Sequence, residues 1–434
     1  MRYAVIGAGA LGLTAAMRLV EQGHHVAVLE RDLQPGGLAS SFEVAPGVWL
    51  ERFYHHFFAS DRSAIRLIED LGLGPRLRWY RPASAVMVDH EVHRLDSPAS
   101  LLAFSPLPVA DRLRMAAGLA FLRAMPSARP LERFTAAGWM RQVFGARAHG
   151  QVWGSLLEAK FGDQAGAVSM AWMWARLHDR TAKLGYLDGG VEPIYRALAD
   201  RVASGGGRLV YGAEVRTIRP AEGGLAVAWD GALGAAPTTD IFDRVVSTLP
   251  PQLTGRLAGI ASTLPASGYL PLSAHCLVLT LERPLTGTYW VGVPSSEGPF
   301  LAVVEHTAMV PAERYGGHHI VYLGAYRKAG DRLPRLPLAD QIAAAEPLLR
   351  VLRPNFSPDW VTGAWSFEAP NAQPIVDTGY RARIPGFDTA VPGLFIATMF
   401  QVYPHDRGQN YSIELAERLV AHLARTPARV GADR

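Results

Sequence analysis

Short apolar runs and an amphipathic stretch alternate at the beginning of the chain. Residues 2–6 form an apolar run that is closed by a glycine, and this pattern predicts a buried β-strand. Apolar side chains then recur at helical spacing over residues 13–20, and Gly23 ends the predicted helix. A second apolar run, residues 25–29, is followed by Glu30. A strand, a helix and a second strand in this order indicate a βαβ unit, which is typical of α/β proteins.

The remainder of the chain is predicted to be helical first and rich in strands later. Apolar residues recur at helical spacing between residues 61 and 180, and prolines separate the helices. Within this part, the short segments 85–88 and 91–94 predict the strands of a β-hairpin whose turn is Asp89-His90. Hydrophobic and polar residues alternate from 273 to 326, which predicts the strands of a second sheet. A last strand and a last helix are predicted over residues 393–423.

The loop between the first strand and the first helix has the spacing Gly-x-Gly-x-x-Gly. Gly7 would make the tight turn, Gly9 would let the backbone approach a pyrophosphate, and Gly12 would let helix and strand pack closely. The N-terminus of the helix offers free N–H groups to phosphates, and Glu30 could accept hydrogen bonds from a ribose. Because the strand, the helix and the acid all fall where the motif needs them, we interpret the loop as a dinucleotide site; the alternative is a structural glycine-rich turn.

A second glycine pair, Gly36-Gly37, follows Glu30 within the run RDLQPGGLASSF. Here the sequence resembles the flavoenzyme superfamily of amine oxidases, protoporphyrinogen oxidase, phytoene desaturases and UDP-galactopyranose mutase, in particular its bacterial protoporphyrinogen-oxidase-like branch. In that superfamily an acid followed by Gly-Gly continues the FAD site. The resemblance therefore implies FAD as the cofactor. Related enzymes with covalently attached flavin use a cysteine near the C-terminus, and since the single cysteine is Cys276, we expect non-covalent FAD.

The resemblance also assigns later positions to the cofactor. In the superfamily a valine gives backbone hydrogen bonds to the adenine, a V-x-x-T-x-P strand closes the FAD domain, and the last helix points its N-terminus at the flavin. The expected FAD-binding residues are Gly7, Gly9, Ala10, Leu11, Gly12, Glu30, Arg31, Gly36, Gly37, Leu38, Val215, Thr248, Asp406 and Asn410.

The expected fold class is α/β, with a Rossmann-like FAD-binding domain of the glutathione-reductase type and an inserted α+β substrate domain. As the resemblance implies, the FAD-binding domain would be discontinuous and consist of residues 1–60, 184–262 and 363–434. Residues 61–183 and 263–362 would form the substrate-binding domain.

Two adjacent histidines, His55 and His56, lie among aromatic residues in the run WLERFYHHFF. In the resembling family this loop passes the flavin ring, and UDP-galactopyranose mutase also has histidines between aromatics here. A neutral imidazole there could hydrogen-bond a substrate hydroxyl, position a sugar or move a proton. Tyr54 is a candidate substrate contact. The alternative is that one of the histidines only packs among the aromatic rings.

The run YPHDRGQNY, residues 403–411, precedes the last helix and resembles Y-P-E-D-R-G-T-N-Y of uncharacterised bacterial relatives of protoporphyrinogen oxidase, with His405 in place of glutamate. So polar a loop between a buried strand and a helix favours a site role for Tyr403, Asp406 and Arg407. The alternative is helix capping by salt bridges.

Two further segments contain candidate site residues. Glu305 and His306 follow an apolar strand and could form an acid/base pair, although a strand-end hydrogen bond would also account for them. Lys160 and Arg176 could hold a phosphate or lie on a solvated face.

Two tryptophans, Trp172 and Trp174, are too close in sequence to share one face of a helix. One of them could therefore line a cavity while the other packs in the core, and we assign Trp174 to the substrate.

Composition limits the functional classes. The 434 residues have a formal net charge of only +4. This small charge does not indicate binding of nucleic acid, but it suits an anionic substrate. The lone cysteine and the absence of metal-ligand spacings speak against a thiolate cluster or any metal site. We expect no signal peptide and no transmembrane segment, hence a cytoplasmic protein. The hydrophobic stretch 113–125 leaves open a peripheral position at the membrane surface and a lipid-linked substrate.

The functional hypothesis is an FAD-dependent oxidoreductase that removes a hydride from a small molecule: a sugar, a glycosylated lipid or a specialised metabolite. Its electron acceptor would be O2, a quinone or NAD(P). The alternative is a non-redox sugar-nucleotide mutase of the UDP-galactopyranose mutase type, which the histidine-containing loop favours. A third possibility is a binding protein on the same fold, like the Rab GDP-dissociation inhibitors; the intact glycine motifs and Glu30 argue against it.

Overall fold

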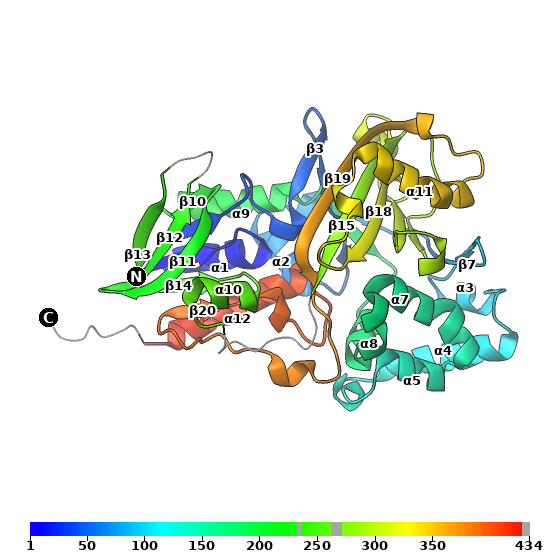
Figure 1. Cartoon of the computed structure of the whole chain (residues 1–434), viewed down its shortest axis with the longest axis horizontal. Coiled ribbons are helices and arrows are strands. Elements are labelled where there is room, and N and C mark those ends of the chain that lie inside the picture. Colours follow the sequence, from blue (N-terminus) through cyan, green and yellow to red (C-terminus); the bar gives the residue numbers. More distant parts are fainter. Residues whose placement is uncertain (232–235, 262–270, 428–434) are drawn as a thin grey trace.

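A computed structural model describes residues 1–231, 236–261 and 271–427 (Figure 1). A five-stranded parallel sheet with the strand order β10-β2-β1-β14-β20 lies at one end of the molecule. Its strands are β1 (Arg2–Ile6), β2 (His25–Glu30), β10 (Arg208–Tyr211), β14 (Arg244–Ser247) and β20 (Leu394–Ile396). Helix α1 (Ala10–Glu21) connects β1 to β2, so the predicted βαβ unit and the α/β class are confirmed.

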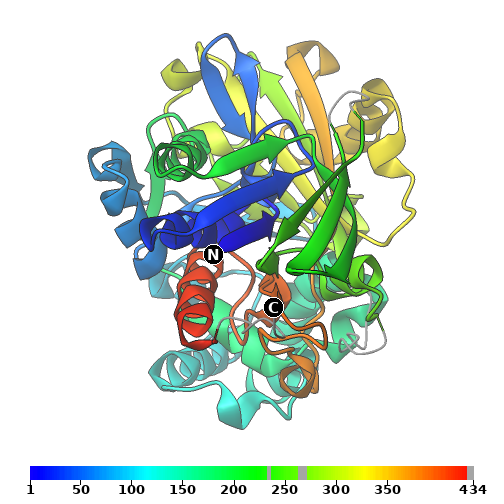
Figure 2. The ribbon, with the colours of Figure 1, turned by 90° about the vertical axis from the view of Figure 1, so that its left-hand side faces the viewer.

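Both faces of the parallel sheet are covered, which explains why its strands are apolar throughout. Tyr3 and Val5 of β1 face a core shared with the helices, whereas Ala4 and Ile6 face a three-stranded antiparallel sheet. The helices are α1, α2 (Arg62–Asp70), α9 (Glu192–Ser204) and α12 (Gln409–Arg425). The antiparallel sheet consists of β11 (Glu214–Ala221), β12 (Gly224–Asp230) and β13 (Thr238–Phe242). Figure 2 shows α12, in red, and this green sheet on either side of the blue strands.

A seven-stranded sheet, order β19-β15-β18-β17-β16-β7-β8, occupies the other end. Its strands are β7 (Ser84–Val88), β8 (Glu91–Arg94), β15 (Leu272–Leu281), β16 (Trp290–Gly292), β17 (Ala302–Glu305), β18 (His319–Arg327) and β19 (Val361–Gln373). The predicted hairpin is confirmed as β7–β8, and its turn residues Asp89 and His90 both have positive φ, as a tight two-residue turn requires. Along β15, Leu277 and Leu279 pack toward α11 (Leu338–Leu352), whereas Cys276 and Val278 face the opposite side.

A group of helices packs below the seven-stranded sheet in Figure 1. It contains α3 (Pro98–Leu102), α4 (Val109–Ala124), α5 (Ala136–Val143), α6 (Ala146–Ala148), α7 (Ser155–Phe161) and α8 (Met170–His178). The remaining elements are α10 (Pro251–Ala258), the pair β3 (Ser41–Ala45) and β4 (Val48–Glu51), and a small sheet of β5 (Phe57–Phe58), β9 (Leu184–Leu187) and β6 (Leu77–Tyr80).

Two of the expected domain boundaries differ from the packing. Helix α2 follows residue 61 but packs in the core of the parallel sheet, because Leu67 and Ile68 lie against α1 and α12. Strand β19 crosses residue 363 and pairs with β15 as far as Gln373, so this strand belongs to the seven-stranded sheet. The boundary expected at 262–263 lies outside the described residues.

Candidate active site

The glycine loop forms a cradle that has no room for a side chain at Gly7 or Gly12. Gly7 has φ +103°, and a Cβ on Gly12 would lie 1.9 Å from the Gly7 carbonyl oxygen. Gly9 is the N-cap of α1 and provides no side-chain cap, so the first turn of the helix keeps N–H groups free for a ligand. The N–H of Gly36 donates to the Ala8 carbonyl at 2.9 Å. This hydrogen bond holds the pair Gly36-Gly37 beside the loop. This arrangement fits the pyrophosphate of a dinucleotide.

Glu30 lies at the end of β2, where the motif requires it. Its carboxylate accepts hydrogen bonds from the N–H groups of Ala8, at 2.6 Å, and Asp32, at 2.9 Å. These bonds orient the acid, and each oxygen retains a lone pair for a ribose hydroxyl. Burial raises the pKa of Glu30. The neighbouring Arg31 is exposed and lies 3.7 Å from Asp32.

The other residues that we assigned to FAD lie at several places around this cradle. Ala10 and Leu11 open α1, and the Thr248 hydroxyl donates to the Ile6 carbonyl at 2.8 Å beneath Gly7. Val215 is nearly buried in β11. Asn410 begins α12, and its side-chain oxygen accepts the N–H groups of Ser63 and Ala64 at the start of α2. That oxygen therefore caps a helix.

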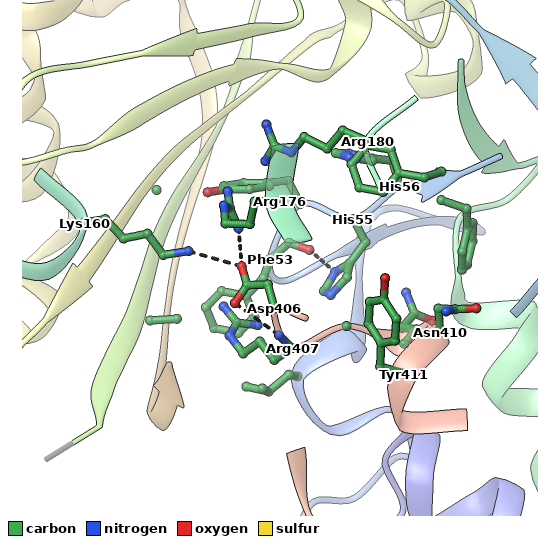
Figure 3. Close-up of a pocket in the computed structure, with 18 of the residues that line it drawn as sticks. Phe53, His55, His56, Lys160, Arg176, Arg180, Asp406, Arg407, Asn410 and Tyr411 are labelled. Carbon is green, nitrogen blue, oxygen red and sulfur yellow. Dashed lines mark hydrogen bonds and ion pairs between the residues drawn. The ribbon is translucent and has the colours of Figure 1, made fainter. Parts of the chain in front are cut away.

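A cavity of about 260 Å³ lies between the parallel sheet, the seven-stranded sheet and the helical group (Figure 3). Polar side chains reach it from the loop after β4, from helices α7 and α8, from strands β15 and β18, and from the segment that leads into α12. Its lining includes Leu38, Tyr54, His55, His56, Lys160, Arg176, Asp179, Arg180, His275, Cys276, Tyr326, Asp406, Arg407, Asn410 and Tyr411.

Both histidines of the aromatic loop line the cavity, and each is held through one ring nitrogen. His55 Nδ1 lies 2.6 Å from the Phe53 carbonyl, so Nδ1 carries the proton and Nε2 is left as an acceptor. His56 Nδ1 lies 2.9 Å from the Tyr289 hydroxyl. Burial lowers the pKa of His55 to about 4 and that of His56 to about 3. Both rings are therefore neutral at neutral pH.

Asp406 is the centre of a cluster of cations. Arg176 forms an ion pair with its carboxylate, Lys160 Nζ lies 3.4 Å away, and the Arg407 backbone N–H donates at 3.1 Å. The side chains of Trp172 and Gln373 complete the donor set, at 3.2 and 3.3 Å. Burial alone would raise the pKa of Asp406, but the three cations hold it well below its usual range. The arrangement joins residues that are more than 200 positions apart.

Arg180 also lines the cavity, although it was not among the predicted site residues. Within the described ranges, its guanidinium has no carboxylate partner; it lies 5.9 Å from the centre of the Phe58 ring. The available signal was its position four residues after Arg176, near the end of α8. Asp179 was also missed: its carboxylate lies 2.7 Å from His405 Nδ1 and accepts from the Tyr411 hydroxyl at 3.1 Å.

Glu305 and His306 do not form the expected acid/base pair. Neither residue lines the cavity. The Glu305 carboxylate accepts the N–H groups of residues 285–287 and the Thr286 hydroxyl, and so fixes the loop after β15. His306 Nε2 lies 2.6 Å from the Tyr315 hydroxyl. Strand-end hydrogen bonding therefore accounts for both residues.

Trp174 and Tyr403 were also predicted to be site residues, but neither lines the cavity. Trp174 faces away from the cavity: its indole N–H donates to the Leu122 carbonyl at 2.9 Å and its ring stacks on His178. Trp172 is the tryptophan that reaches Asp406. Residues two positions apart point to different sides of a helix, so only one of the two tryptophans of α8 can do so. Tyr403 stacks on Tyr380 outside the cavity lining.

Comparisons with known proteins identify the family of this chain. The family described as flavin containing amine oxidoreductase matches residues 12–405. The 15-cis-phytoene desaturase of Narcissus pseudonarcissus is 25% identical over 245 residues, which cover 50% of this chain and 42% of that protein. The desaturase of Synechococcus elongatus is 35% identical over 79 residues, 18% of this chain and 17% of that protein. The chain thus spans less than half the length of these curated relatives.

Solved structures share the fold over nearly the whole chain. An oxidoreductase from Methanosarcina mazei has a TM-score of 0.69 at 18% identity, covering 96% of this chain and 100% of its own. Reduced UDP-galactopyranose mutase has a TM-score of 0.72 at 17% identity, covering 98% and 95%. Since the family match extends over most of the sequence, the chain belongs to the flavin-containing amine oxidoreductases, a family of FAD-dependent enzymes.

Proposed function

We propose that this protein oxidises a small molecule by transferring a hydride from it to FAD. The proposal rests on the polar cavity between the start of α12 and the seven-stranded sheet. In this proposal the parallel sheet and its helices form a Rossmann-like FAD-binding domain of the glutathione-reductase type, into which the substrate domain is inserted. When bound, FAD supplies the hydride acceptor. The N-terminus of α12, whose N-cap Gly408 has no side-chain cap, would stabilise negative charge on the reduced cofactor.

The lining of the cavity favours a substrate with an anionic group and several hydroxyls. Arg180 lacks a carboxylate partner in the described structure, and Asp406 is shared among several cations, so an incoming phosphate or carboxylate would balance the charge. The neutral His55 ring offers Nε2 as an acceptor for a hydroxyl. A sugar derivative, a glycosylated lipid or a specialised metabolite that carries such a group meets these requirements.

Anaerobic bleaching of the flavin tests this proposal. Purified protein is mixed without oxygen with UDP-glucose, glucose 6-phosphate, glycerol 3-phosphate and a glycosylated isoprenyl phosphate, and absorbance near 450 nm is followed. We expect one class of anionic compound to bleach the flavin, and O2, a quinone or NAD(P) to restore the absorbance. The proposal fails if none of these compounds bleaches a bound flavin.

A matched pair of variants tests the anionic recognition. Arg180→Gln should raise the KM of an anionic substrate at least tenfold, because one charge-assisted hydrogen bond is worth about 1.5–3 kcal/mol. Arg219→Gln, on the exposed side of β11 and outside the cavity lining, serves as the control. Equal KM values for both variants would contradict an anion at Arg180.

The second candidate function is a non-redox mutase, which is favoured by the adjacent histidines in the cavity wall. It requires reduced flavin and gives no net oxidation. The protein is therefore reduced with dithionite and incubated with UDP-galactose, and the products are separated by chromatography. An isomer that forms only after reduction, without bleaching of the oxidised protein by any compound, would replace the oxidoreductase proposal.

We also propose a peripheral position at an anionic membrane surface, which would suit a lipid-linked substrate. Val109, Leu113 and Phe121 lie on one exposed side of α4, with exposed fractions of 62%, 55% and 54%. Arg112 and Arg114 on this helix bind main-chain carbonyls rather than carboxylates, so their charges remain available to lipid phosphates. No helix within the described ranges is long and apolar enough to span a bilayer.

A further inference from the structure

Lysine is rare in this chain, and one lysine is nevertheless in the cavity. Only three of the 43 lysine and arginine residues are lysines: Lys160, Lys183 and Lys328. Lys183 is exposed, and the Lys328 side chain is 59% exposed and paired with Asp163. The Lys160 side chain is only 11% exposed. Arginine thus fills nearly every cationic position, whereas the cavity retains a group that can also exist as a neutral amine.

The charges around Lys160 are unbalanced. Asp406 is the carboxylate within reach of its ammonium, at 3.4 Å, and the same carboxylate is in direct ion-pair contact with Arg176. Arg407 follows Asp406 in the chain and bonds to the Tyr326 hydroxyl of β18. A guanidinium cannot release its proton at accessible pH, so Lys160 is the member of this cluster that can relieve the surplus charge.

The position of the amine separates it from water. Its Nζ lies 4.8 Å from the ring centre of Trp172, 5.0 Å from that of Tyr326 and 5.4 Å from that of Phe161. Helix α7 places it opposite Arg176 of α8, and Figure 3 shows both side chains pointing at Asp406. Burial, and after it the charge of Arg176, lowers the pKa of Lys160 well below its ordinary value, although Asp406 opposes the shift.

The two histidines of the cavity wall are neutral rings at neutral pH. With pKa values of about 4 and 3, His55 and His56 accept hydrogen bonds but hold a proton poorly at neutral pH. Asp406 is engaged by several donors and holds a proton still less well. Lys160 is the one amine in the described lining, and its neutral form has a lone pair that accepts a proton directly.

We propose that Lys160 is the catalytic base of this cavity. The inference rests on the proposed oxidoreductase function. As a C–H bond of the substrate breaks and its hydride goes to FAD, the O–H or N–H bond on the adjacent atom also breaks. Its proton forms a bond with the lone pair of Lys160 Nζ, and a C=O or C=N bond forms in the product. Asp406 then stabilises the new ammonium, which returns the proton to solvent.

The ionisation of Lys160 can be measured directly, without turnover. The full chain with bound FAD is labelled with 13C at lysine Cε, and the 1H–13C signals are followed between pH 6 and pH 11. Three lysines give three signals, which Lys183→Arg and Lys328→Arg assign. The two surface lysines should titrate near ~10.4 and Lys160 at least ~2 pH units lower. Titration of Lys160 together with the surface lysines would overturn the proposal.

Two variants test why the titration midpoint of Lys160 is low. Arg176→Gln removes a repelling charge and should raise the Lys160 midpoint, whereas Asp406→Asn removes the stabilising carboxylate and should lower it. Absorbance of bound FAD and the far-UV circular dichroism verify that each variant is folded. A midpoint that moves in the opposite direction in both variants would contradict the assigned cluster.

The pH dependence of flavin bleaching then tests the catalytic role. With the compound of the panel above that bleaches the flavin, Lys160→Arg should slow bleaching about 100-fold or more and remove its rise with pH. Unchanged bleaching in this variant overturns the base assignment while the oxidoreductase function stands. A low Lys160 midpoint with no bleaching by any compound supports the neutral amine and counts against the oxidoreductase function.

Discussion

Individual residues in this protein have roles that depend on their burial. Glu51, at the end of β4, is fully buried, and its carboxylate accepts the Tyr186 hydroxyl at 2.8 Å and the Val191 N–H at 2.8 Å. Burial raises its pKa from 4.5 to about 7, because these neutral donors only partly replace the lost hydration. Glu51 therefore binds a proton in the folded state at pH values at which the unfolded chain has released it.

Glu51 should make stability fall as the pH rises. Because its folded-state pKa lies above the unfolded value, the folded protein holds an additional proton between pH 4.5 and about 7. The stabilisation is therefore largest below pH 4.5, decreases through this window and is constant above it. Relative to Glu51→Gln, the wild type should lose about 3 kcal/mol of unfolding free energy between pH 4.5 and 8.

Urea unfolding of both proteins at pH 5 and pH 8 measures this difference. Glu69→Gln, at an exposed position of α2, is the matched control and should leave the pH dependence of the wild type unchanged. Parallel pH profiles of the wild type and Glu51→Gln would show that Glu51 titrates normally in the folded state.

Residue types alone did not distinguish the candidate residues from one another. His55, His56, Lys160, Arg176, Asp406 and Arg407 all line the cavity, whereas Glu305 and His306 do not. Both groups contain a carboxylate and an imidazole side chain, so residue type alone does not separate them. The difference arises because the loop after β15 supplies backbone donors to Glu305.

At the scale of elements, the strand–loop–helix unit β1–α1 is the part whose geometry the local sequence determines most strictly. The helix approaches the strand so closely that the Gly7 carbonyl occupies the position of a Cβ on residue 12. Backbone contact of this kind is set by local geometry. It could therefore be predicted from the spacing of three glycines and the apolar runs on either side.

Gly12→Ala should prevent FAD retention. Its Cβ would meet a backbone oxygen at 1.9 Å, so the helix must move away from the strand and the N–H groups of the cradle lose their positions. A shift of this kind costs about 1–3 kcal/mol, equivalent to roughly a tenfold to hundredfold weaker FAD binding. Flavin absorbance per protein after gel filtration is the measurement. Gly166→Ala, where a Cβ meets no atom within 4 Å, is the control and should retain full flavin.

At the scale of the whole molecule, the helical group connects the outer surface to the cavity. The inner face of α4 packs against α8, where Trp174 donates to Leu122, and α8 presents Arg176 to the cavity. The exposed side of α4 is thus one helix away from the proposed substrate site (Figure 1). A membrane contact here would place lipid-linked compounds next to the wall of the cavity.

The double variant Leu113→Ser/Phe121→Ser should weaken vesicle binding about a hundredfold, because burying each side chain contributes about 1.5–3 kcal/mol. Sedimentation with phosphatidylglycerol–phosphatidylcholine vesicles measures the binding, which should also decrease with added salt. Leu336→Ser, at an exposed position outside the helical group, is the control. Failure of the wild-type protein to sediment with these vesicles would contradict the membrane-facing role of α4.

Local patterns in the sequence by themselves determined the βαβ unit, the glycine cradle and the β7–β8 hairpin, because backbone conformation and burial periodicity act over a few residues. The expectation of FAD came from the resemblance to the flavoenzyme superfamily. Only the tertiary structure decided which polar residues meet. Asp406 joins Lys160 and Arg176 across more than 200 positions, Arg180 enters the same cavity, and Trp172 rather than Trp174 reaches the site. Such contacts depend on how sheets and helices pack against one another, and no local spacing encodes that packing.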